Sequence, residues 1–260
     1  MTRLQISYTL TFTAPFHMGT GISAGLLDRT VIRKAQGYLY VPASTFKGVL
    51  REHCEQLSRF YLPTIHVPSP HVTAAALNEF ESEPTLLSRI FGSQLSAGGL
   101  HFENATQSPD DLDMYQVGGG REYKEAQVDI ATQVRIDRHT RTAVDRALYS
   151  SEFGIRELSF MGTIKGQLMC MPIDSLTSMI TLDEETYTIT PTYSLLLLLA
   201  GLLLIERLGG NKSTGKGQCN CTIREVLIDR RPCPQASWEN WVKHLDLLSN
   251  YPHPESGGQV

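Results

Sequence analysis

An unbroken apolar run from Leu195 to Ile205, with the sequence LLLLLAGLLLI, constrains the fold more than any other feature of this chain. Such a run suits either a helix that crosses a membrane or a helix buried in a protein core. A membrane span needs ~20 apolar residues, whereas this run ends at Glu206 and Arg207. The sequence therefore predicts a buried core helix, which we place over residues 191–208 with the proline at a tolerated early position.

Composition and charge limit the kind of protein that this chain can be. Of its 260 residues, 41% are hydrophobic and 19% are charged, as in globular proteins. We expect a single domain over residues 1–230, with insertions around 60–170, and a C-terminal extension over 231–260. The net charge of −4 argues against a protein that binds nucleic acid through its overall charge. An RNA or DNA site must then be a local basic patch or be shared with other subunits.

The five cysteines form no metal-binding pattern. Cys219 and Cys221 make a C-x-C pair in a strand-like run, which is tighter than the C-x-x-C of a zinc knuckle. The N-terminal sequence MTRLQISYTLTF alternates apolar and polar residues, unlike a signal peptide. An odd number of cysteines without a secretion signal indicates a reducing compartment, so we expect a cytoplasmic protein.

Alternation and helical spacing predict the main elements. Residues 4–12 alternate as in a half-buried strand. Residues 30–33 and 38–41 flank Gly37 and are expected to pair as a hairpin. A helix is expected to begin at residues 42–45, with Ser44 or Thr45 capping its free N–H groups, and to continue to Leu57 with apolar residues at helical spacing.

Shorter segments complete the prediction. We expect a helix at 86–91 ended by Gly92, a strand at 100–102, a loop or insertion at 110–125, strand pieces within 155–170 broken near Gly162, a strand with a phase slip at 219–228, and a helix around 238–248. Without the insertions, the order is strand, helix, strand pieces, helix, strand. This order predicts an α+β fold with a ferredoxin-like or RRM-like βαββαβ core.

A glycine-rich segment, LGGNKSTGKGQ over residues 208–218, follows the predicted core helix. Its glycines let the backbone approach a ligand closely, and its lysines and hydroxyl groups suit phosphate oxygens. An ATP-binding P-loop is the rival interpretation. The string G-x-x-x-x-G-K-[ST] is absent, because Lys216 is followed by Gly217, and the segment leads from a helix into a strand, the reverse of a P-loop. A plain flexible connection stays open as an alternative.

Asp28 lies on a glycine-containing loop between two predicted strands. Beside Arg29, Arg33 and Lys34, such a residue is usually a solvated acid. Near a phosphodiester, its carboxylate could instead hold a divalent cation or orient an attacking hydroxyl. His17 is a second candidate for proton transfer, although a histidine at the end of a strand is more often structural.

Two further segments are candidates for phosphate contacts. A helix N-terminus favours an anion, and Lys47 would reinforce this effect beside Ser44 and Thr45. The arginines between 134 and 146 could contact phosphates or stack on bases, while the aspartates among them also fit a solvated hairpin.

Taken in order, these motifs resemble the RAMP superfamily of CRISPR-associated proteins, and in particular the repeated backbone subunits of type III RNA-targeting effector complexes. The N-terminal pattern is Gly19-Thr20-Gly21, Asp28, Val31-Ile32-Arg33 and the helix start PASTFKG at residues 42–48, and the second signature is the glycine-rich segment. The resemblance has departures: Ala43 stands where the family commonly has glycine, and Thr214 and Lys216 where it commonly has arginine and an aromatic residue.

The resemblance implies an RRM-like core, stacking of subunits along a guide RNA, and a thumb-like hairpin to which residues 134–146 would belong. It implies that Asp28 cuts complementary target RNA with a divalent metal, Mg²⁺ being the expected ion. The residues expected to contact RNA are Ser44, Thr45, Lys47, Arg51, Arg135, Arg138, Asn211, Lys212, Ser213 and Lys216. The expected partners are guide RNA, target RNA and other effector subunits, with no membrane.

Three alternatives remain open from the sequence. The chain could be an RNA-binding scaffold or capping subunit of the same kind of complex, without a catalytic role. It could be a stand-alone endoribonuclease that processes CRISPR transcripts without a metal, using His17 or another base. A nucleotide hydrolase is a more distant alternative.

Overall fold

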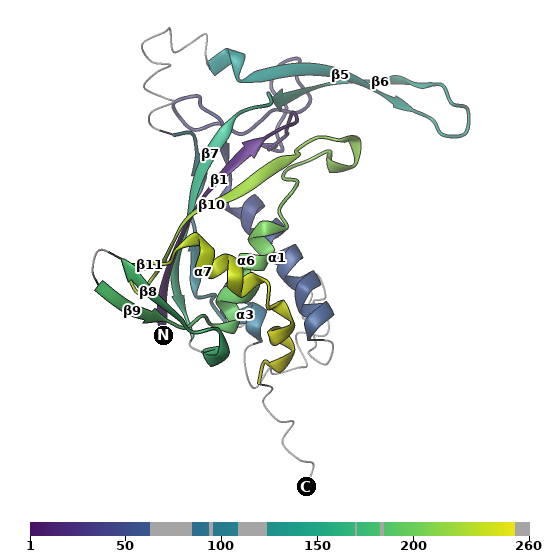
Figure 1. The fold of residues 1–260 in the computed structure, drawn as a ribbon. Helices are drawn as coiled ribbons and strands as arrows, with labels where there is room; N and C mark the ends of the chain where they lie inside the picture. Colours follow the sequence, from purple (N-terminus) through teal and green to yellow (C-terminus); the bar gives the residue numbers. More distant parts are fainter. Residues whose placement is uncertain (63–84, 94–95, 109–123, 170, 183–184, 253–260) are drawn as a thin grey trace.

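An antiparallel sheet carries the fold, and the helices cover one of its faces (Figure 1). The computed structural model describes residues 1–62, 85–93, 96–108, 124–169, 171–182 and 185–252. The sheet has the strand order β11-β10-β1-β7-β4-β2, and β3 also pairs with β7. Its strands are β1 (Thr2–Phe12), β2 (Tyr40–Val41), β3 (Leu100–Phe102), β4 (Ala105–Thr106), β7 (Ser159–Leu168), β10 (Cys219–Ile228) and β11 (Arg231–Pro232).

The predicted α+β class is confirmed. The helices are α1 (Ala43–Tyr61), α3 (Leu86–Phe91), α6 (Tyr193–Leu203) and α7 (Gln235–Val242). In the central part of the sheet, β10, β1, β7 and β3 lie side by side, with α1 following β1 and α6 following β7 in the chain. The finer assignment to a ferredoxin-like core stays a prediction.

Strand β1 lies at the centre of the sheet, between β10 and β7. Its alternate residues face the helices and are almost completely buried: Leu4, Ile6, Tyr8, Leu10 and Phe12. The predicted phase slip in β10 is a β-bulge: Ser7 pairs with Glu225 and Tyr8 with Ile223, which leaves Arg224 between them. The bulge therefore returns Val226 to the buried face.

Helix α6 is the predicted core helix, and its residues from Ser194 to Leu202 are buried. It packs against α1, where a Cβ on Gly201 would lie 2.6 Å from the sulfur of Cys54. The predicted C-terminal end at 208 is wrong, because the helix ends at Leu203 and the chain then turns to pair with the residues before β10. Among the described helices, none is long and apolar enough to cross a membrane.

Three local predictions need correction. Residues 159–168 form one continuous strand. Gly162 does not break it: glycine is present because the Tyr8 ring packs over this position, where a side chain would collide with it. Residues 30–33 are not a regular strand: Arg33 makes an isolated antiparallel bridge to Leu39, while Tyr40 and Val41 pair with β4. The hairpin expected around Gly37 is thus a turn.

The third correction concerns the start of α1. Pro42 occupies the N-cap position and offers no side-chain cap, while Ser44 and Thr45 lie within the first turn. The side-chain oxygen of Asn104 instead accepts the Ala43 N–H at 2.8 Å. The capping group therefore comes from a segment far away in the sequence.

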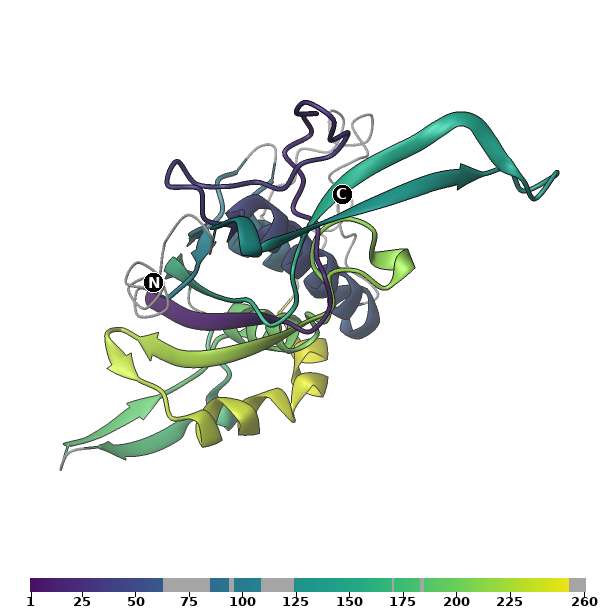
Figure 2. The same ribbon diagram turned by 90° about the horizontal axis from the view of Figure 1, so that it is seen from above.

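Two hairpins project on opposite sides of the body (Figures 1 and 2). The longer hairpin pairs β5 (Val128–Ile136) with β6 (Ala143–Gly154). The shorter pairs β8 (Ser178–Leu182) with β9 (Glu185–Ile189), and the sequence analysis did not predict it. Most of the loop predicted at 110–125 lies outside the described residues.

The C-terminal segment packs on the body of the molecule. The helix predicted around 238–248 is α7 followed by a short 3₁₀ helix at Leu245–Asn250. Trp241 is completely buried, and its indole nitrogen donates to the Ser178 hydroxyl at 3.0 Å. These contacts connect the segment after β11 to the β8–β9 hairpin.

Two glycine substitutions test this packing. In Gly162→Ala, the new methyl group would collide with the Tyr8 ring. We therefore expect the free energy of unfolding to fall by about 1–3 kcal/mol. Gly48→Ala is the matched control, because nothing lies near that position on α1 and alanine favours a helix over glycine by about 1 kcal/mol. Urea denaturation of both variants would measure the difference. A Gly162→Ala variant as stable as the wild type would contradict the packing described for Tyr8.

Candidate nucleic-acid interface

At the base of the long hairpin, one edge of β6 pairs with β5. The loop that carries Asp28 covers the other edge. The Asp28 N–H donates to Ser150 O at 2.9 Å, and the Ser150 N–H donates to the Asp28 carboxylate at 2.8 Å. The Glu152 N–H donates to Arg29 O at 2.9 Å. Asp28 is exposed, so its carboxylate is held on the hairpin while it faces solvent.

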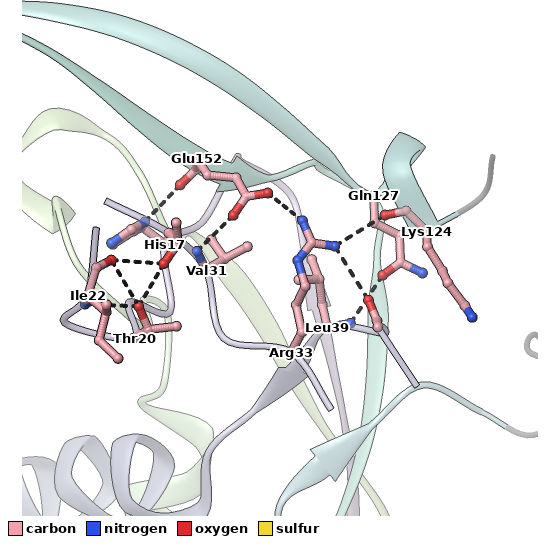
Figure 3. A network of polar contacts seen from close by, with 11 residues as sticks. His17, Thr20, Ile22, Val31, Arg33, Leu39, Lys124, Gln127 and Glu152 are labelled. Carbon is pink, nitrogen blue, oxygen red and sulfur yellow. Dashed lines mark hydrogen bonds and ion pairs between the residues drawn. The ribbon is translucent and has the colours of Figure 1, made fainter. Parts of the chain in front are cut away.

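Glu152 joins the hairpin to the same loop through its side chain (Figure 3). One carboxylate oxygen accepts the Val31 N–H at 3.0 Å, and the other forms an ion pair with Arg33. Arg33 also donates to two backbone oxygens, those of Gly37 at 3.4 Å and Lys124 at 3.3 Å. Glu152 is buried, and an unpaired buried charge would destabilise the folded protein. These partners compensate the charge of its carboxylate.

Beside Arg33, the side chain of Gln127 anchors the start of β5. Its amide oxygen accepts the Leu39 N–H at 3.2 Å, and its amide nitrogen donates to the side chain of Gln107 at 3.2 Å. Gln127 is completely buried. Both strands of the hairpin are therefore tied to residues 31–39.

The glycine-rich segment reaches the same junction through His17. Gly210 N–H donates to His17 O at 2.8 Å, and a Cβ on Gly209 would lie 2.6 Å from that oxygen. His17 Nδ1 lies 2.8 Å from Glu152 O, so this nitrogen carries the proton. The His17 ring also packs against Phe153, with centroids 5.6 Å apart. These contacts give His17 a structural role.

The glycine-rich segment has a defined shape. Asn211 and Gly215 both have left-handed backbone angles, with φ of 60° and 81°, and they bracket a 3₁₀ turn at Lys212–Thr214. The Lys212 carbonyl accepts from Arg207 at 2.9 Å. The Lys216 ammonium lies 4.9 Å from the centroid of the Phe153 ring. Ser213 is exposed at the turn, and Lys212 and Lys216 are partly exposed, so one short loop presents hydroxyl and ammonium groups that solvent can reach.

The structure thus brings together two predicted sites that are far apart in the sequence. Asp28 contacts Ser150, and Lys216 contacts Phe153, so that both lie on the last few residues of β6. A phosphate chain that follows the base of the hairpin would meet a carboxylate and a cationic loop in succession.

The start of α1 forms a separate cluster at the same end of the molecule (Figure 1). Lys47 lies over the ring of Phe102, with its ammonium 5.6 Å from the centroid. Burial lowers the pKa of the Lys47 ammonium, and the charge of Arg51 lowers it further. A nearby anion would offset both effects. Arg51 itself donates to Glu55 at 2.8 Å and to the carbonyl of Gly92 at 3.1 Å, so it is engaged within the fold.

The outer part of the long hairpin carries the predicted arginines. Arg135 lies on β5 and Arg138 lies in the turn between the strands, and both are exposed. The segment from 135 to 146 contains four arginines and two aspartates, in a chain whose net charge is −4. A local basic patch therefore exists on the projecting arm.

Asp28 is the candidate ligand for a divalent cation. In the described part of the chain, no group of three or more His, Cys, Asp or Glu residues is arranged to hold a metal. This suits a tightly bound structural ion poorly. A single exposed carboxylate is the kind of protein ligand that Mg²⁺ uses together with water and substrate phosphates.

Sequence reasoning missed the residues that assemble this junction, namely Phe16, Gln127, Tyr149, Ser150, Glu152 and Phe153. Each acts through a partner far away in the chain, as Glu152 does with Arg33. A single sequence gives no signal for such pairs, and Glu152 lies in β6 among successive buried residues that show no alternation.

Comparison with known proteins identifies a family and many similar solved structures, two of which are given below. A model of the RAMP superfamily matches residues 9–220. The structure of Type III-B Cmr-beta bound to cognate target RNA matches with a TM-score of 0.52, at 12% identity, over 84% of this chain and 96% of the other. The apo state of Type III-B Cmr-beta matches with a TM-score of 0.53 at the same identity and coverage. At this identity the likeness concerns the fold alone. No curated protein matches the chain.

Substitutions at Asp28 test how the loop is held. In Asp28→Ala, Ser150 loses its side-chain acceptor, so the Ser150 amide should exchange its hydrogen faster, by about fivefold for a bond of about 1 kcal/mol. In Asp28→Asn, the amide oxygen can still accept, and exchange should stay near the wild-type rate. Hydrogen-exchange mass spectrometry of the peptide containing Ser150 would compare the two. Equal exchange in Asp28→Ala and the wild type would refute the docking of the loop.

Proposed function

The chain belongs to the RAMP superfamily, and from this premise we propose that it is a subunit of a type III RNA-guided effector complex. In this role it binds guide RNA along the sugar-phosphate backbone and cuts complementary target RNA at Asp28. The convergence of Asp28 and the glycine-rich segment on β6 carries the proposal. The likeness to Cmr-beta, one of whose structures is described as bound to cognate target RNA, supports it.

The proposed contacts with guide RNA lie in three groups. Asn211, Lys212, Ser213 and Lys216 offer hydroxyl, amide and ammonium groups on one short loop, where Ser213 is exposed and the other three are partly exposed. Ser44, Thr45 and Lys47 lie in the first turns of α1, where the helix dipole favours an anion. Arg135 and Arg138 lie on the basic arm. Such contacts to phosphates fix position without reading sequence, which suits a protein whose guide supplies the specificity.

Gly48 supports the proposed RNA contact at α1, because a glycine inside a helix lowers the stability of that helix. It lies within α1 with open space around its Cα, where alanine would stabilise the helix by about 1 kcal/mol. A glycine that the fold itself does not need is consistent with the close approach of a ligand backbone. It follows Lys47 directly, on the same stretch of helix that we assign to the guide.

For cleavage, Asp28 would be the protein ligand of a Mg²⁺ ion, and the RNA phosphate and water would complete its coordination. When bound, such an ion lowers the pKa of an attacking hydroxyl and stabilises charge on the phosphate. The contribution of the chain is positional. The Ser150 N–H holds one carboxylate oxygen, so Asp28 presents the rest of its carboxylate to solvent beside the hairpin.

A second candidate function is an RNA-binding subunit without cleavage. The bond from the Ser150 N–H to Asp28 favours it, because that bond alone gives the aspartate a reason to be present. The stand-alone, metal-free nuclease finds less support, since His17 is bound to Glu152 O and packed against Phe153.

Cleavage assays separate the two functions. We expect the complex, purified from cells that co-express this chain with its genomic neighbours, to cut labelled complementary RNA in Mg²⁺ and to lose one or more cuts in Asp28→Asn. This variant keeps the acceptor for Ser150 but loses the charge that holds a cation. Unchanged cuts in Asp28→Asn, with guide RNA still bound, would assign the chain a scaffold role.

Guide retention tests the glycine-rich segment. Lys212→Ala should weaken binding of the guide, and the slope of log affinity against log salt should fall by about one. Lys243→Ala removes an equal charge from the exposed end of α7 and should change neither. Equal salt slopes for the wild type and Lys212→Ala would contradict a phosphate contact at this loop.

A further inference from the structure

Glu152 makes four polar contacts among the described residues, and all of them go to the segment from 17 to 33. Its side chain accepts from Val31 and pairs with Arg33, its N–H donates to Arg29 O, and its carbonyl oxygen lies 2.8 Å from His17 Nδ1. The segment from 17 to 33 also contains Asp28. No other contact between the hairpin and this segment involves a buried charge among the described residues.

The ion pair with Arg33 extends this connection to the other strand. The Arg33 guanidinium is shared between the Glu152 carboxylate and two backbone oxygens, one in the turn at Gly37 and one at Lys124 just before β5. Nη2 of the guanidinium pairs with the carboxylate while Nη1 donates to both backbone oxygens, and a planar fork of this kind holds its donors in fixed directions, which a flexible lysine ammonium does not. Glu152 therefore lies where the Asp28 loop, β5 and β6 meet (Figure 3).

Behind Glu152, small residues and aromatic rings hold the strand in place. Phe16 and Gly154 exchange both backbone hydrogen bonds, with N···O distances of 3.0 and 2.7 Å, and the Phe16 ring covers the face of Gly154. Before Glu152 in the same strand, the ring of Tyr149 lies under the guanidinium of Arg29, 5.3 Å from the ring centroid. The backbone of β6 is thus fixed on both sides of Glu152, and the Glu152 side chain then fixes the loop.

We propose that Glu152 is a positioning residue that joins the Asp28 loop and the β5–β6 hairpin into one rigid unit, and so sets which phosphate of a bound RNA faces Asp28. Its consequence for cleavage rests on the proposed function. Glu152 itself touches no substrate. It acts through Arg33 and Val31, and misplacement of a reacting group by about 1 Å can slow a reaction by about a hundredfold.

The variants are chosen to break the charge pairing while they keep the shape. Glu152→Gln can still accept from the Val31 N–H but leaves Arg33 without its counterion. Since removing one partner of a buried pair costs more than removing both, Arg33→Gln/Glu152→Gln should be less perturbed than Glu152→Gln alone. Glu103→Gln is the matched control, because it removes a more exposed ion pair with Lys165 on the sheet.

The first readout is hydrogen exchange in the full chain within its complex. In Glu152→Gln, amides of residues 20–31 should exchange about tenfold to a hundredfold faster, the double variant should recover part of the protection, and Glu103→Gln should match the wild type. Wild-type exchange in Glu152→Gln overturns the proposal. This readout does not depend on any cleavage activity, so it decides the positioning role even if the wild-type complex cuts no RNA, a result that would instead refute the proposed function.

The second readout is cleavage, with guide and target binding measured alongside. With binding unchanged, Glu152→Gln should cut about a hundredfold more slowly or spread its cuts over neighbouring phosphates, and the double variant should recover part of the wild-type pattern. A purely structural defect would lower binding and cleavage together. Faster exchange with wild-type rate and cut positions would also overturn the proposal, because the loop would then not need Glu152 to place Asp28.

Discussion

A buried carboxylate must find partners within the protein, and Glu152 finds all of those described in the segment from 17 to 33. Because isolated charges are costly away from water, this requirement forces the first loop and the long hairpin into one arrangement. The remainder of the junction follows from it. Asp28 is placed on Ser150, and the Gly210 N–H donates to the carbonyl of His17, whose ring contacts Glu152 O.

This arrangement reconciles an acidic chain with a role beside RNA. The net charge is −4, yet the outer arm carries four arginines within residues 135–146 and the glycine-rich segment carries Lys212 and Lys216. Near the base of the hairpin, Lys216 lies over the ring of Phe153 and Arg29 lies over the ring of Tyr149. Local placement, and not overall charge, would then determine where a phosphate chain binds.

Elements governed by local physics could be predicted from the sequence. The alternation in β1, the apolar run of α6, the phase slip in β10 and the end of α3 at Gly92 each leave a pattern within a few residues, and the structure has all four. Contacts between distant segments leave no such pattern. The cap from Asn104 and the pairing of Glu152 with Arg33 were missed for this reason.

Glycines show the same limit for the site. The sequence indicates that glycine gives conformational freedom, but the partner decides its role: Gly162 makes room for Tyr8 and Gly209 for the His17 carbonyl, whereas Gly48 has open space. Only the structure separates glycines that pack from those left for a ligand. The candidate residues were therefore found from motifs, while the way in which they are brought together was not.

Cross-linking of the native complex tests the central claim most directly. Ultraviolet light would be applied to the complex purified with its bound nucleic acid, and the peptides joined to RNA would be identified by mass spectrometry. The account predicts cross-links in the glycine-rich segment, the start of α1 and the β5–β6 arm, all of which lie around one end of the molecule (Figure 1). A complex without RNA, or cross-links confined to α7 and the β8–β9 hairpin, would contradict it.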